Sequence, residues 1–89
     1  RYTSLALDAA GQPHISYYGN GALKYARWTG SGWDIQTVDS GGGWLTSLAL
    51  DADGRPHISY YDFTNGDLKY AWQGQAVFLY LPLVLRNSP

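Results

Sequence analysis

The chain of 89 residues contains no cysteine and no methionine, and these two absences restrict its chemistry. Without thiols it can form no disulfide and offers neither a thiolate metal ligand nor a cysteine nucleophile. Because an arginine occupies position 1, we expect the chain to be a processed product or part of a longer protein.

Charge is also scarce, since only 15% of the residues are charged and the formal net charge is −1. The few Lys and Arg residues are scattered, so no basic patch is predicted and nucleic acid is excluded as a partner. The longest apolar run, residues 76–85, is interrupted by Pro82, and a membrane-spanning helix needs about 20 apolar residues. We expect no membrane span, and any export signal lies outside this chain.

Two copies of one unit of about 44 residues make up most of the chain. The segment Thr3–Tyr18, TSLALDAAGQPHISYY, returns as Thr46–Tyr61, TSLALDADGRPHISYY, and a second matching stretch pairs Asn20–Ala26 with Asn65–Ala71. Between the two matching stretches the second copy has Asp62-Phe63-Thr64 where the first has a single glycine, which predicts a loop.

Each unit breaks into short runs rich in aromatic and β-branched residues, separated by Gly, Pro, Asn and Asp. No window has a sustained helical period. In the first unit these runs predict the strands Thr3–Asp8, His14–Tyr18, Leu23–Trp28 and Trp33–Val38. Four antiparallel strands in a repeat of this size are typical of a β-propeller blade, with a β-sandwich as the competing interpretation.

The predicted fold class is therefore all-β, with two four-stranded antiparallel propeller blades that form an incomplete propeller. We assign residues 1–43 to the first blade, 44–75 to the inner strands of the second, and 76–89 to a divergent outer strand and C-terminal tail. A ring typically has 4–8 blades. The expected partners are thus further blades of the same chain, or copies of the chain, that complete a ring.

The string S-L-A-L-D-A-x-G-x-P-H-I-S-Y-Y, followed by L-K-Y-A and a T-V-D ending, resembles the tandem blade repeats of exported bacterial β-propeller proteins, which are distantly similar to sialidase-type blades. The tail Phe78–Asn87, with its YLPLVLR segment, is similar to the closing segment of some secreted bacterial proteins, where it serves export or surface attachment. The resemblance implies a recognition scaffold at the bacterial cell surface or outside the cell, and it implies no single activity. An edge strand containing Pro82 is the alternative interpretation of the tail.

Two features invite a catalytic or metal-binding interpretation, and the sequence argues against both. His14 and His57 occupy the same position in the two units, so we expect each to pack or hydrogen-bond within its own sheet. The segment Asp51–Gly54 is similar to the start of a calcium loop, but the further ligands of such a loop do not follow it. We predict a turn there, with no metal and no cofactor.

Glycoside hydrolysis usually needs two carboxylates across a sugar, or a tyrosine nucleophile with an acidic partner. All the acids here are aspartate and most lie in repeated turns; Asp62 stands where the first unit has Gly19 and would be the first choice for a catalytic acid. We predict no catalytic residue and favour a non-catalytic binding or scaffold module that recognises a glycan or a protein. The alternative is a fragment of a sialidase-like glycoside hydrolase whose catalytic residues lie mostly outside this chain. The candidate ligand-binding residues are Tyr18, Trp44, Tyr61, Asp62 and Phe63.

Overall fold

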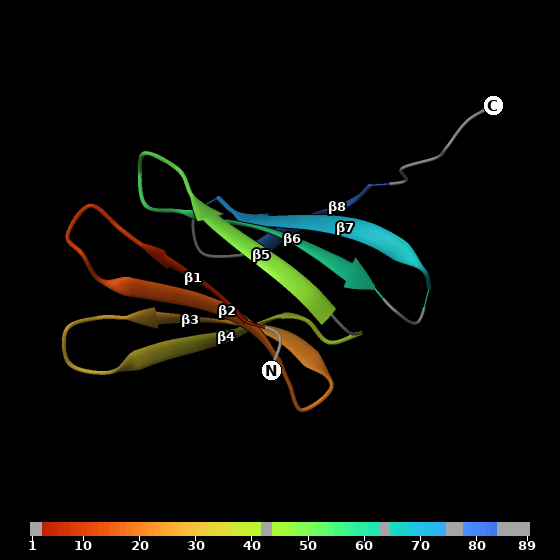
Figure 1. The fold of residues 1–89 in the computed structure, drawn as a ribbon, viewed down its shortest axis with the longest axis horizontal. Coiled ribbons are helices and arrows are strands. Elements are labelled where there is room, and N and C mark those ends of the chain that lie inside the picture. The colour runs from red at the N-terminus through yellow and green to blue at the C-terminus, as the bar shows by residue number, and fades with distance from the viewer. Residues whose placement is uncertain (1–2, 42–43, 63–64, 75–77, 84–89) are drawn as a thin grey trace.

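A computed structural model of the chain describes residues 3–41, 44–62, 65–74 and 78–83. The regular elements in these ranges are all β-strands (Figure 1). The strands are β1 (Thr3–Leu7), β2 (Pro13–Gly19), β3 (Ala22–Trp28), β4 (Trp33–Asp39), β5 (Trp44–Leu50), β6 (Pro56–Asp62), β7 (Asp67–Gln73) and β8 (Phe78–Leu83). In this described part of the chain no helix is long and apolar enough to cross a membrane.

The strands form two antiparallel sheets in which each strand pairs with its neighbour in the sequence. The first sheet has the order β1-β2-β3-β4 and the second β5-β6-β7-β8. The all-β prediction is confirmed, and the four strands predicted for the first unit agree with the observed ones to within a residue at either end. The divergent segment Phe78–Leu83 pairs with β7 as the outer strand of its sheet.

The turn between β1 and β2 is held together by the carboxylate of Asp8. Its Oδ1 accepts hydrogen bonds from the backbone N–H groups of Ala10 at 2.9 Å and Gln12 at 3.0 Å. Gly11 supplies the positive φ of 77° that closes the turn, a conformation that costs glycine little. Asp51 makes the same pair of bonds in the turn between β5 and β6, so the turn predicted at this position is confirmed.

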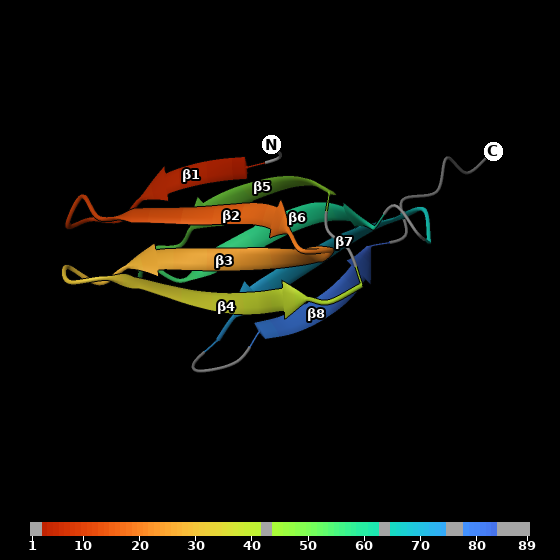
Figure 2. The same ribbon diagram turned by 90° about the horizontal axis from the view of Figure 1, so that it is seen from below.

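The two sheets pack face to face, with the first sheet lying across the second (Figure 2). Strands β1 and β5 approach each other closely because Ser4 and Ala6, the residues of β1 that face β5, are small. The Ser4 hydroxyl accepts a hydrogen bond from the backbone N–H of Leu48 at 3.1 Å, and the Thr46 hydroxyl donates one to Ser16 Oγ at 2.9 Å. The core between the sheets consists of Leu23, Tyr25, Val38, Leu48, Ile58, Tyr60 and Ala71.

The two sheets bury opposite faces of the same repeat. Leu48 in the second sheet is 8% exposed, whereas Leu5, at the matching position of the first sheet, is 62% exposed. Tyr25 in the first sheet is 1% exposed, whereas its counterpart Tyr70 is only half-buried. The second sheet is therefore stacked on the first in the same orientation. The two sheets do not turn the same face of the repeat toward each other.

Candidate functional site

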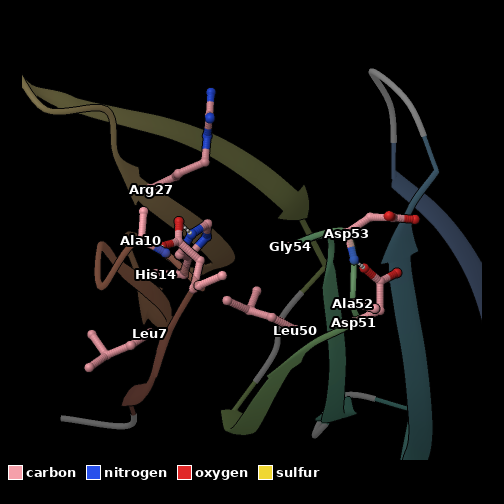
Figure 3. A pocket seen from close by; sticks show the side chains of 11 residues that line it. Leu7, Ala10, His14, Arg27, Leu50, Asp51, Ala52, Asp53 and Gly54 are labelled. Atoms are coloured by element: carbon pink, nitrogen blue, oxygen red, sulfur yellow. Dashed lines mark hydrogen bonds and ion pairs between the residues drawn. The ribbon is translucent and has the colours of Figure 1, made fainter.

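An open groove runs between the sheets at the end of the molecule where the two aspartate turns lie (Figure 3). One part of it, of about 490 Å³, lies between the turn after β1 and the turn after β5. A second hollow of about 410 Å³ is lined by residues of β3, β4, β6 and β7. The two hollows share Arg27, Asp53 and Gly54, so they form one continuous depression.

A buried histidine lies in the wall of this groove and is held from both sides. Nε2 of His14 is 2.9 Å from Oδ2 of Asp8, and its Nδ1 is 2.6 Å from the hydroxyl of Tyr25. An ionised carboxylate can only accept, so Nε2 carries the proton toward Asp8. When Nε2 carries the only ring proton, Nδ1 accepts a hydrogen bond from the hydroxyl of Tyr25. Each polar atom of the histidine is thus satisfied, as burial requires.

The second sheet repeats this arrangement on its open face. His57 bonds through Nε2 to Asp51 at 3.0 Å and through Nδ1 to the hydroxyl of Tyr70 at 2.5 Å. The side chain of His57 is 31% exposed, against 3% for His14, because the second sheet turns this face outward. The prediction that both histidines hydrogen-bond within their own sheets is confirmed.

The pKa values of the aspartates and of Tyr25 are shifted in the directions that preserve these hydrogen bonds. The hydrogen bond from His14 lowers the pKa of Asp8, and the bond from His57 lowers that of Asp51. Burial raises the pKa of Tyr25 to about 12. At neutral pH both aspartates are therefore ionised acceptors, and Tyr25 keeps its proton to donate to His14.

The remaining lining of the groove combines apolar side chains, such as Leu7 and Leu50, with polar side chains that carry charges of both signs. Arg27 extends from β3, and its guanidinium lies 3.4 Å from the carboxylate of Asp34. Across the groove Asp53 is exposed at the tip of the second turn. The side-chain amide of Gln73 donates to Gln36 at 3.3 Å and links the two sheets at the floor. Donors and acceptors from both sheets thus face one depression.

The aromatic candidates lie at the opposite end of the strands, away from the groove. The rings of Tyr18 and Trp44 are 5.8 Å apart and inclined by 60°, and Trp44 pairs across the ladder with Tyr61. All three are half-buried. The structure thus brings together three of the five candidate ligand-binding residues, while Phe63 lies outside the described residues.

Asp62, the remaining candidate, is buried in an ion pair. Its Oδ2 lies 3.0 Å from Nζ of Lys69 and accepts a hydrogen bond of 2.8 Å from the side chain of Asn65. The bonds from Asn65 and Lys69 lower the pKa of Asp62 to about 2. The same pairing raises the pKa of Lys69. A ligand that used this carboxylate would have to displace both partners.

A polar junction between the sheets was not anticipated by the sequence analysis. The Tyr60 hydroxyl donates to Oδ2 of Asp39 at 2.7 Å, and Nζ of Lys69 lies 3.4 Å from the same oxygen. Tyr60 is completely buried. The sequence did contain a signal for this junction. A lysine recurs between apolar residues in both repeats, as Lys24 and Lys69, and a lysine on such a strand needs a carboxylate partner.

Within the described ranges, no group of three or more His, Asp, Glu or Cys side chains could hold a metal ion. No known family model matches the chain, and no curated protein matches it significantly.

Proposed function

We propose that the chain is a segment of a β-propeller and acts as a non-catalytic binding module. The observation that carries this proposal is that matching units bury opposite faces, as Leu5 and Leu48 illustrate. A sandwich of two duplicated sheets can close on itself by burying the same face of each. Units that stack in one direction instead leave a front face and a back face open, as blades of a ring do.

The groove between the sheets is the surface on which a ligand would bind. A hollow of about 490 Å³ is large enough for a small ligand or a sugar unit. Arg27 and Asp53 offer an exposed donor and an exposed acceptor on opposite sides. Sugar hydroxyls both donate and accept hydrogen bonds, so a glycan fits this lining, and a location outside the bacterial cell is consistent with such a ligand.

Two features support binding without turnover. A glycosidase needs a general acid whose pKa is raised, so that it keeps a proton to give to the leaving group. Asp8 and Asp51, which line the groove, instead have lowered pKa values because each accepts a hydrogen bond from a histidine. The same aspartate and histidine also occur in both units, whereas a catalytic site is usually built once.

Asp53→Ala tests the groove with little risk to the fold, because the first unit has Ala10 at this position. Asp67→Ala is its matched control, since the first unit has Ala22 there and Asp67 is not among the groove residues. After a glycan array has identified a ligand, titration of the chain should show about tenfold weaker binding for Asp53→Ala, the loss of one charged hydrogen bond. Asp67→Ala should bind as the unchanged chain does.

A parallel titration of Trp44→Ala decides between the groove and the aromatic end. If this variant loses binding while Asp53→Ala keeps it, the ligand sits on Tyr18 and Trp44 and the groove assignment is wrong. Failure to bind any glycan or protein ligand, or release of sugar from a bound glycan, would overturn the proposed function.

A further inference from the structure

The face of the first sheet that points away from the second sheet is apolar and open. Leu5 and Leu7 are 62% and 61% exposed on it. In the second sheet the matching face is covered, because it packs on the first sheet through Leu48 and Leu50. The chain thus contains one face of this repeat docked on a partner sheet and a nearly identical copy of that face without one.

The polar part of this face is also incomplete in the first sheet. In the second sheet Tyr60 and Lys69 both reach the carboxylate of Asp39 on the neighbouring sheet. Their counterparts are Tyr17 and Lys24, and neither has a hydrogen-bond or ion-pair partner among the described residues. Tyr17 and Lys24 share one face, since they pair directly across the ladder between β2 and β3.

The first sheet cannot supply the missing carboxylate itself. Lys69 has a second partner within its own sheet, Asp62, at 3.0 Å. At the position of Asp62 the first unit has Gly19, so Lys24 has no such neighbour. Lys24 is half-buried on an apolar sheet face, and its ammonium group is therefore left to an external acceptor.

We propose that this open face docks a further repeat of the same type as residues 3–41, with an aspartate at the position of Asp39. The Tyr17 hydroxyl donates a hydrogen bond to that carboxylate and Lys24 forms an ion pair with it. Leu5 and Leu7 pack on the inner strands of the incoming sheet. This proposal rests on the proposed propeller stacking and adds the chemistry by which one unit selects the next.

The chemistry argues against a second copy of this chain as the occupant. The first sheet of such a copy is covered by its own second sheet, so only the open face of the second sheet is free to dock. In the first sheet Leu23 pairs with Asp39, and in the second the matching Leu68 pairs with Leu83. The second sheet thus has a leucine where the junction needs a carboxylate.

A chain extended by one repeat tests the inference. Residues 1–43 are placed before Arg1, which occupies the repeat position of Trp44, so the junction keeps the natural spacing. Urea unfolding of the extended and natural chains is then compared for Tyr17→Phe and Lys24→Gln. Both substitutions should leave the midpoint of the natural chain unchanged and lower that of the extended chain. Asp39→Asn in the added repeat alone should remove this difference.

Two results would overturn the inference: equal midpoints for Tyr17→Phe and its parent in the extended chain, or dimerisation of the natural chain that Leu5→Asp abolishes in sedimentation. Tyr60→Phe in the natural chain separates the two proposals. If Tyr60→Phe also leaves the midpoint unchanged, the stacking in the proposed function is wrong. If it lowers the midpoint while Tyr17→Phe has no effect in the extended chain, only the further inference fails.

Discussion

From the contacts at the junction between the sheets, we predict how much unfolding free energy is lost in Tyr60→Phe. Tyr60 is completely buried and donates to Asp39 at 2.7 Å. A hydrogen bond to a charged group contributes roughly 1.5–3 kcal/mol. The carboxylate keeps the backbone N–H of Gly41 at 2.8 Å and Lys69 at 3.4 Å when the hydroxyl is removed. Because Asp39 keeps these two partners, the expected loss of unfolding free energy lies around and just below the lower end of this range, at about 1–2 kcal/mol.

The repeat provides the matched control, since Tyr17→Phe removes the same hydroxyl from a site where the described residues offer it no hydrogen-bond partner. Its expected cost is below about 0.5 kcal/mol, as for other surface substitutions. Urea unfolding at neutral pH, followed by tryptophan fluorescence, measures both. In a chain of 89 residues, a loss of 1–2 kcal/mol should lower Tm by about 5–15 °C. If the two variants differ by less than about 0.5 kcal/mol, the junction does not hold the sheets together.

Three further predictions concern other parts of the fold. Leu48→Ala should cost about 2–4 kcal/mol of unfolding free energy and Leu5→Ala less than about 0.5, because only the first side chain is buried; equal costs in urea unfolding would contradict the assignment of faces. The pKa of Asp62 is lowered from 3.8 to about 2, so its pairing with Lys69 stabilises the fold above about pH 4 and is lost as the pH falls toward 2. The stability advantage of the unchanged chain over Asp62→Asn should therefore shrink across that range, and a constant difference would rule the pairing out. Leu45 has a φ of 46°, a left-handed conformation that is strained for leucine and better tolerated by asparagine. Leu45→Asn should therefore raise the unfolding free energy by about 0.5–1 kcal/mol. If calorimetry shows a lower unfolding free energy for Leu45→Asn than for the unchanged chain, the leucine side chain contributes more than the backbone strain costs.

The strands and turns were readable from the sequence because their causes are local. Apolar alternation, Pro13 at a strand start and the Asp8 turn act over a few residues. At Asn20 and Gly21 both φ values are positive, at 52° and 75°, as the Asn-Gly pair predicts. The predicted hydrogen bonding of His14 was also accessible, because repetition marked it as structural before its partners were known.

The groove and the junction were not readable in this way, because their residues come from separate strands. Arg27 and Asp53 lie far apart in the sequence and line the same groove only because the sheets stack. Asp39 and Tyr60 are 21 residues apart and belong to different repeats. Of the aromatic candidates, Tyr18 and Trp44 do meet, but no local sequence pattern indicates that they pack on each other.

The sequence alone determined that the chain is all-β and built from two matching units, because strand periodicity and turn chemistry depend on near neighbours. It could not decide which face of each unit is buried, since the two copies are almost identical there and both faces carry apolar residues. Only the tertiary structure made Leu48 buried and Leu5 exposed. The physical reason is the direction of stacking: identical units placed one after another must bury opposite faces, and two faces are then left open.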